Sequence, residues 1–517
     1  MKKKIKAPNR KGEYVDRYIQ YIPARYIFAI LITILEIIMV IGIVFLCAIY
    51  IPYFYIALYV TVIGVVISII VSNDNPDYKI PWLLCVICIP IIGFMLYFLF
   101  YKRKLTKKLI KKLNAVNESL EKDNEKELNN ITDKLIKSQA KELINIANTH
   151  IYQNTKLEYY KIGEEMHTSI LNELKKAKKF ILLEYFIIEE GIFWNSILDI
   201  LVEKVKSGVE VRVIYDDIGC IATLPGNYCK TLINKGIKAV SFAKLKGQAD
   251  SEFNNRNHRK ILVIDGKVGF SGGVNIADEY INEKEVYGHW KDTGIKLEGR
   301  AVNELTKLFL IDYSINSKEE INFNNYYIDY SVESNSFIIP FGDGPRPIFE
   351  KNVGKIVIMN LLNQAKDYVY ITTPYLIIDN ELMRNIENTS LRGVDVRIIV
   401  PHIPDKKIVF EMTKSNYQTL IKSGVKIYEY EPGFIHSKLY LSDDTVGMIG
   451  TINLDYRSLT HHFENGVWIY NDRAILDMKE DFINTMNSSI YMNDEKIKNN
   501  IFSKLIRIIV RVFSPLL

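Results

Sequence analysis

The chain has 517 residues, enough for about three domains of ordinary size. Its formal net charge of +6 is too small to indicate a nucleic-acid-binding protein by itself. Five cysteines, three of them inside apolar stretches, exclude an even disulfide framework of the kind that stabilises small secreted domains. The informative features are therefore local patterns.

The first hundred residues are typical of a membrane region. Eight lysines and arginines in the first 25 residues are followed by a long apolar stretch in which Glu36 is the only charge. At about 20 residues per crossing, the apolar blocks predict three spans, at about 27–49, 53–72 and 80–101. We expect a multi-pass protein of the cell membrane, with residues 1–101 as its membrane region.

The side of the membrane follows from basic residues. They flank the membrane region at both ends, and the positive-inside tendency would place both ends in the cytoplasm. Three spans would instead separate the ends, so one block can be re-entrant or interfacial. We expect the rest of the chain to be cytoplasmic.

A charged segment follows at 102–154. Leucines at helical spacing, such as Leu105, Leu109 and Leu113, alternate there with lysines and acidic residues. The pattern predicts a linker helix that lies partly on the lipid headgroups.

From about residue 155 onward the sequence alternates helical and strand patterns, and it repeats itself. The run AKKFILLEYF at 177–186 resembles AKDYVYITTPY at 365–375, and SGVEVRVIY at 207–215 resembles RGVDVRIIV at 392–400. Nearly constant offsets between these segments indicate two copies of one α/β domain, each a largely parallel or mixed sheet covered by helices. The two copies are predicted at about 155–310 and 335–517.

Each copy contains the same polar signature once. A His is followed by a Lys two residues on, an Asp five after the Lys, and then a Gly and an Asn. The first copy supplies His258, Lys260, Asp265, Gly272 and Asn275, and the second supplies His436, Lys438, Asp443, Gly450 and Asn453. By chance, the His-basic-acidic part alone should occur about 0.12 times. The duplication indicates a functional site rather than two ordinary edge strands.

The residue types in this signature suit an anionic phosphodiester. Residues two apart in a strand share a face, so each His and its Lys point the same way. Lysine and asparagine can bind phosphate oxygens and stabilise developing charge, and two histidines can divide the roles of nucleophile and general acid and base. We interpret the His, Lys and Asp of each copy as catalytic residues and the two asparagines as phosphate-binding residues. The competing interpretation is a metal site, but a Lys beside each His would repel the cation. We expect no metal and no cofactor.

Two further acidic residues follow the signatures at matching places. Asp292 and Glu464 each precede a predicted strand. A carboxylate that accepts the Nδ1–H of a catalytic His would fix its tautomer, whereas the alternative is an ordinary surface acid. Their neighbours His461 and His462 are interpreted as bystanders.

The C-terminal run at 496–517 has lysines and arginines between isoleucine, leucine and phenylalanine. It can be a core helix, but the basic face favours an amphipathic helix docked at the membrane interface.

The paired signature resembles that of the phospholipase D superfamily. The apolar N-terminal blocks, the run NPDYKIPW at 75–82 and the ending SPLL at 514–517 narrow the resemblance to the bacterial cardiolipin synthases. The resemblance implies N-terminal transmembrane helices followed by two homologous phospholipase D-like domains related by pseudo-two-fold symmetry. A single active site would form where the two domains meet.

The resemblance also implies a reaction. Phosphatidyl transfer between two phosphatidylglycerol molecules would give cardiolipin and glycerol through a phosphatidyl-histidine, with His258 as nucleophile and His436 as acid and base. Phosphatidylglycerol and other membrane lipids would be the partners, and nucleic acid would not. The same residues would serve a hydrolase or a head-group transferase that uses another alcohol. A nuclease would gain nothing from apolar spans, and a decayed, non-enzymatic protein should have lost some motif positions.

Overall fold

The computed structural model describes residues 2–8, 14–20, 24–50, 53–72, 74–98, 125–244, 255–317, 319–346, 348–493, 495–496, 510–512 and 514–516. Most of the expected C-terminal amphipathic helix, and the first part of the expected linker helix, lie outside these residues.

Apolar helices form most of the N-terminal region. A hairpin of β1 (Lys2–Pro8) and β2 (Tyr14–Gln20), which the sequence did not predict, precedes α1 (Ala24–Tyr50) and α2 (Tyr53–Val71). Within α1, the stretch Ile27–Phe45 is long and apolar enough to cross a membrane, and Tyr55–Val71 is apolar but shorter. Phe28 and Leu35 on α1 are 61 % and 66 % exposed, as side chains in contact with lipid would be.

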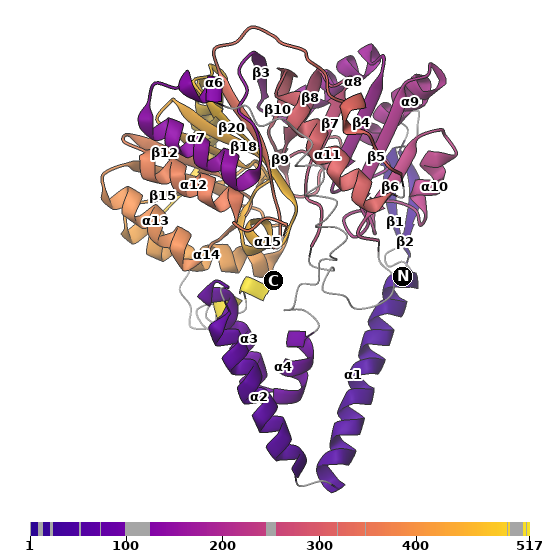
Figure 1. Cartoon of the computed structure of the whole chain (residues 1–517), viewed down its shortest axis with the longest axis vertical. Helices are drawn as coiled ribbons and strands as arrows, with labels where there is room; N and C mark the ends of the chain where they lie inside the picture. The colour runs from indigo at the N-terminus through magenta and orange to yellow at the C-terminus, as the bar shows by residue number, and fades with distance from the viewer. Residues whose placement is uncertain are drawn as a thin grey trace.

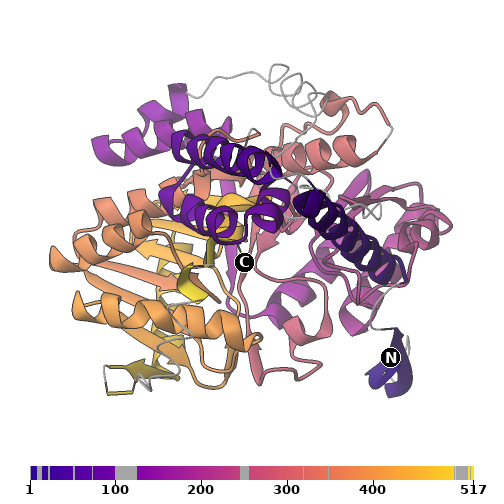
Figure 2. The same ribbon diagram turned by 90° about the horizontal axis from the view of Figure 1, so that it is seen from below.

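The third apolar block is not one continuous helix. It consists of α3 (Pro76–Cys88) and α4 (Pro90–Leu96), separated at Ile89. Pro90 has no N–H and restricts the residue before it, so it begins a new helix instead of continuing α3. The block expected to span at 80–101 is therefore kinked, and whether it crosses the membrane stays a prediction. Figure 1 shows α1 and the group α2–α4 extending below the α/β part, and Figure 2 shows them from below.

Two mixed sheets repeat one another, which confirms the predicted duplication. The first has the order β3 (Thr155–Tyr160), β10 (Gly294–Gly299), β8 (Val268–Gly272), β7 (Ile261–Ile264), β4 (Phe180–Tyr185), β5 (Glu210–Asp216), β6 (Lys238–Phe242). The second has the order β11 (Phe337–Asp343), β20 (Glu464–Tyr470), β18 (Val446–Gly450), β17 (Leu439–Ser442), β12 (Tyr368–Thr372), β14 (Asp395–Pro401), β15 (Lys426–Tyr430), β21 (Ser489–Met492). Apart from β21 the orders match strand for strand, with three parallel strands in each.

Helices cover both sheets (Figure 1). The helices of the α/β part are α6 (Glu125–Asn129), α7 (Lys134–Ala147), α8 (Gly163–Lys176), α9 (Ile192–Lys206), α10 (Tyr228–Ile233), α11 (Val302–Asn316), α12 (Val353–Gln364), α13 (Asn380–Leu391), α14 (Lys407–Lys422), α15 (Tyr456–Thr460) and α16 (Ala474–Asn487). One apolar core joins side chains of both sheets to Phe309 of α11 and Phe482 of α16. Because this core belongs to both copies, the halves are packed as one body.

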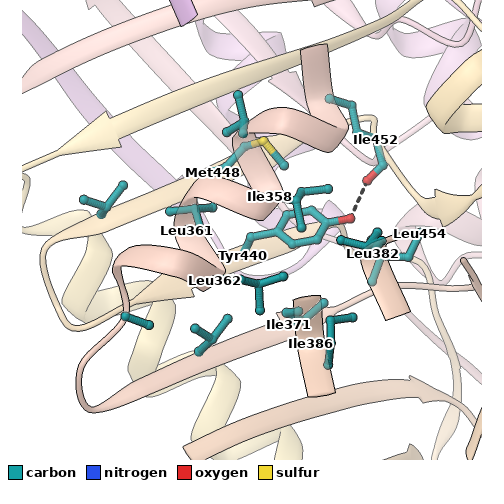
Figure 3. Close-up of a cluster of buried hydrophobic side chains, with 14 of the residues drawn as sticks. Ile358, Leu361, Leu362, Ile371, Leu382, Ile386, Tyr440, Met448, Ile452 and Leu454 are labelled. Carbon is teal, nitrogen blue, oxygen red and sulfur yellow. Dashed lines mark hydrogen bonds between the residues drawn. The ribbon is translucent and has the colours of Figure 1, made fainter. Parts of the chain in front are cut away.

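A second core lies between the far face of the second sheet and α12 and α13 (Figure 3). Tyr440 of β17 is buried among Ile358, Leu362 and Leu382, and its hydroxyl donates to the carbonyl oxygen of Ile452, 2.9 Å away. Ile452 directly precedes Asn453, so this bond fixes the segment that carries one of the candidate site residues.

Candidate active site

Each signature covers two neighbouring central strands of its sheet, β7 and β8 in the first and β17 and β18 in the second. Its histidine lies between the two halves. Lys260 and Lys438 directly precede β7 and β17, and both are fully buried. His258 and His436 are only 6 % and 7 % exposed. The sequence predicted that each His and Lys share a face, and in both copies the lysine ammonium donates back to the carbonyl oxygen of its own His.

The two halves exchange backbone contacts at the histidines. β9 (His289–Lys291) pairs with β16 (Gly433–Ile435), and the N–H of His436 donates to the carbonyl oxygen of Lys291, 2.7 Å away. In the reciprocal position the N–H of His258 donates to Phe463, 2.8 Å away. Each histidine is therefore held by backbone from the other half, which produces one composite site.

The carboxylates predicted to orient the histidines cross between the halves in the same way. Glu464 Oε2 lies 2.9 Å from Nδ1 of His258, and Asp292 Oδ2 lies 2.6 Å from Nδ1 of His436. Both carboxylates are fully buried. Neither is an ordinary surface acid. The sequence did not indicate that each carboxylate would bind the histidine of the other copy.

Side chains that sequence reasoning missed hold Glu464 in place and join the two halves. Ser458 on α15 donates to Glu464 Oε1 over 2.7 Å, and the Thr451 hydroxyl donates to Oε2. Asn465 joins the two halves, since its Nδ2 donates to Ser271 Oγ over 2.7 Å and its Oδ1 accepts from the N–H of Lys260. Thr451 directly follows Gly450 of the signature and Asn465 directly follows Glu464, but single hydroxyl and amide residues are too common in sequences to stand out.

Burial keeps both histidines neutral. It lowers the pKa of His258 to about 3 and that of His436 to about 4, with the neighbouring lysines acting in the same direction. Asp292 stays ionised: burial raises its pKa, but the interactions with His436 and Lys438 lower it below its ordinary value. A neutral imidazole beside an ionised carboxylate carries its proton on Nδ1, which leaves the Nε2 lone pair free for chemistry.

Both lysines titrate near neutrality. Burial lowers the pKa of Lys260 to about 7 and that of Lys438 to about 8. Two cations in an otherwise low-dielectric site favour an anionic ligand, and the ligand's charge would in turn keep them protonated. This electrostatic field is suited to a phosphodiester and opposes a free cation.

The two asparagines predicted to bind phosphate are both buried beside the signatures, but they differ in their contacts. Asn275 is engaged at both ends of its amide, with the N–H of Ile187 and the hydroxyl of Tyr280. The side-chain oxygen of Asn453 is buried and has no hydrogen-bond partner among the described residues.

Asp265 and Asp443, interpreted from the sequence as catalytic, lie at the opposite ends of β7 and β17 from the lysines. Asp265 accepts from the N–H groups of Lys178, Lys179 and Phe180 at the start of β4. Asp443 accepts from the matching amides at 366–368 before β12. A carboxylate that accepts from three backbone donors holds a turn in place, and a catalytic role of these two residues stays a prediction.

The glycines of the signatures serve the sheets rather than a ligand. A Cβ on Gly272 would lie 2.5 Å from the carbonyl oxygen of Thr293 on the neighbouring segment, and one on Gly450 would lie 2.3 Å from that of Asn465. Gly272 also has a φ of +147°. These glycines let the backbone that follows Asp292 and Glu464 approach β8 and β18 closely.

One group of side chains in the site has the composition of a metal site. Ligand atoms of His258, His462 and Glu464 lie within 4.8 Å of one another. Glu464 already accepts hydrogen bonds from His258 and two hydroxyls, and Lys260 places a buried ammonium nearby. These contacts disfavour a cation, and the expectation of no metal remains a prediction.

A cavity of about 760 Å³ lies away from the histidines, between the N-terminal region and the second half. At its edge Asn75 Nδ2 donates to Asp379 Oδ2 over 2.6 Å, and Asp77 Oδ2 accepts from the N–H of Asn380 over 2.8 Å. The hydroxyl of Tyr456, on α15, also donates to Asp77. The start of α3 is therefore attached to the same short helix whose Ser458 holds Glu464.

Comparisons with known proteins agree with this architecture. A family model described as "Cardiolipin synthase, PLD-like domain" matches residues 170–309 and 358–486, and one described as "Phospholipase_D-nuclease N-terminal" matches residues 57–100. A cardiolipin synthase of Alkalihalophilus pseudofirmus is 34 % identical over 88 % of this chain and 92 % of that protein. An uncharacterized protein of Streptococcus mutans is 41 % identical over 88 % of this chain and all of that protein.

Among solved structures, phosphatidylserine synthase of Haemophilus influenzae resembles the fold. Its TM-score is 0.55 at 19 % identity, and the match covers 73 % of this chain and 98 % of that one. The duplicated sheets and the match of the family model across both halves lead to one conclusion. The chain belongs to the cardiolipin synthase family of the phospholipase D superfamily.

Proposed function

We propose that the protein transfers a phosphatidyl group from one phosphatidylglycerol to another, which gives cardiolipin and free glycerol. The observation that carries this proposal is the reciprocal pairing of His258 with Glu464 and of His436 with Asp292 around two buried lysines. Two oriented imidazoles in a cationic site can perform a two-step displacement at phosphorus. The relatives named as cardiolipin synthases support this choice of lipid substrate.

In the first step, the Nε2 lone pair of His258 attacks phosphorus and forms an N–P bond. The bond from phosphorus to the headgroup glycerol breaks, and His436 gives a proton to the departing oxygen. For this His436 must be protonated, and the bound phosphodiester favours that state because its negative charge raises the histidine pKa. Lys260 and Lys438 stabilise the charge that develops on the phosphate oxygens.

In the second step, the headgroup hydroxyl of a second phosphatidylglycerol attacks the phosphatidyl-histidine. His436, now neutral, takes the hydroxyl proton, a new P–O bond forms, and the N–P bond to His258 breaks. Both histidines return to their starting states. One phosphodiester is exchanged for another, so the balance requires no nucleotide and no metal.

The N-terminal region would anchor the site at a membrane. We propose a multi-pass arrangement at the cell membrane with a cytoplasmic active site, supported by the exposed apolar faces of α1 and α2 and by the basic flanks of the region. The anchor would keep both the donor and the acceptor lipid close to the site.

The test is purified protein in detergent with phosphatidylglycerol as the only lipid, excess chelator and no nucleotide, with products identified by mass spectrometry. Cardiolipin and glycerol in a one-to-one ratio are expected. Phosphatidic acid and glycerol would instead identify a hydrolase. If product appears only after another alcohol is added, the protein is a different head-group transferase.

A further inference from the structure

Two rings next to the histidines carry buried nitrogen atoms that have no hydrogen-bond partner among the described residues, and the rings lie at equivalent places in the two halves. One is the indole of Trp290, through Nε1, and the other is the imidazole of His462, through both ring nitrogens. A buried donor without a partner loses its hydrogen bonds to water and gains none in return, so such groups call for an explanation.

Strand register establishes the equivalence. Gly294 pairs with Gly272 in the first sheet, and Gly466 pairs with Gly450 in the second. The residue four positions before Gly294 is Trp290, and the residue four positions before Gly466 is His462. The two rings therefore occupy the same position relative to the two signatures, although one is an indole and the other an imidazole.

Each ring lies beside the catalytic histidine of the other half. The ring centres of Trp290 and His436 are 5.7 Å apart, with a 47° angle between the planes. Those of His462 and His258 are 5.6 Å apart, with an angle of 43°. Nδ1 of His462 lies 3.7 Å from Glu464 Oε1, which is too far for a hydrogen bond.

The chemistry of the indole identifies what such a pair would bind. An indole N–H can donate but cannot accept, so the ligand of Trp290 must present an acceptor. An imidazole can donate as well, and the two rings flank a site that contains two buried lysines. An anionic phosphodiester, with two non-bridging oxygens and two ester oxygens, offers the acceptors that both rings lack.

We propose that Trp290 and His462 each donate a hydrogen bond to the phosphodiester of the lipid substrate, one from each side of the composite site. This inference rests on the proposed function, because it assigns residues to the same site. His462 is then a substrate-binding residue and not the bystander that the sequence suggested.

The test removes each donor while keeping a ring of similar shape, in the variants Trp290→Phe and His462→Phe. The matched control is Trp194→Phe, because Trp194 is also buried but its Nε1 already donates to Tyr228 over 2.6 Å, inside the core of the first half. Binding of inorganic phosphate to the full-length protein in detergent is measured by calorimetry. The KM for phosphatidylglycerol is measured in the same preparations.

We expect each phenylalanine variant to weaken phosphate binding and to raise KM by about ten-fold, the usual effect of one hydrogen bond to a charged group. His462→Asn, which keeps a donor, should recover most of the loss, and Trp194→Phe should match the wild type. If a phenylalanine variant fails to fold, leucine at the same position replaces it.

Unchanged phosphate affinity and KM in both donor-free variants would overturn the inference, as would an equal loss in Trp194→Phe. The proposed function fails separately, if the wild-type protein binds phosphate but makes no cardiolipin from phosphatidylglycerol.

Discussion

At the scale of single residues, the site depends on carboxylates that determine where the imidazole protons lie. Glu464 and Asp292 accept the Nδ1 protons of His258 and His436, so both Nε2 atoms are free to react. The sequence could identify these acids as candidates by their matching position. It could not show the exchange between halves, because that depends on how two copies pack together.

Replacing Glu464 by Gln should lower kcat by about 10²- to 10⁴-fold, because an amide can donate to Nδ1 and thereby favour the wrong tautomer. The measurement is cardiolipin formation from phosphatidylglycerol in detergent. Glu165→Gln, at a half-exposed site on α8, is the control and should be fully active. A Glu464→Gln protein that folds and turns over at the wild-type rate would refute the orienting role.

The pH dependence should reflect the lysines. The pKa values of Lys260 and Lys438, about 7 and about 8, are lowered by burial. As pH rises through this range the free enzyme loses the charges that bind phosphate, so kcat/KM should fall. Protonation of His258, with a pKa near 3, should reduce activity only in strong acid. A kcat/KM that increases from pH 7 to pH 9 would contradict this assignment.

At the scale of elements, the signature combines two functions that spacing alone cannot separate. The His and Lys lie at one end of β7 and β17, and the Asp lies at the other end, in a turn with positive φ at Asp265 and Asp443. Periodicity predicted the strands and their duplication correctly. The role of the Asp could be recognised only once the positions of β4 and β12 were known, because these strands come from distant parts of the chain.

Asp265→Ala should therefore destabilise the fold without disabling the chemistry. Loss of the acceptor for three backbone amides should cost about 1–3 kcal/mol and lower the midpoint of thermal unfolding. The kcat of the folded fraction should stay within a few-fold of the wild type. Asp329→Ala, at an exposed side chain, is the control. Full stability with abolished turnover would support the catalytic interpretation.

At the scale of the whole molecule, one apolar core joins the two sheets and two further cores lie largely within one half each. Side chains of α2 and α3 form a separate small cluster with Tyr97. Hydropathy identified this region. The break at Pro90 follows from the proline itself. The attachment of the start of α3 to α13 and α15 could not be predicted, because it depends on tertiary contacts.

A protein that begins at Glu125 should fold, since no described residue before Leu128 belongs to the three large cores. It should retain transfer activity in mixed micelles and lose at least about ten-fold on vesicles, where the anchor would supply the lipid concentration. Circular dichroism and the two assays check this expectation. Equal activity on vesicles would show that the N-terminal region does not deliver substrate.

A two-step transfer through a histidine of one composite site is tested most directly by trapping the intermediate. Wild-type protein and the variants His258→Ala and His436→Ala would be mixed with phosphatidylglycerol, quenched at alkaline pH within one turnover, digested and mapped by mass spectrometry. We expect a phosphatidyl group on His258 in the wild type and none in His258→Ala. Both variants should form no cardiolipin. Cardiolipin formation with no phosphatidyl group on either histidine, or normal turnover in either variant, would contradict this mechanism.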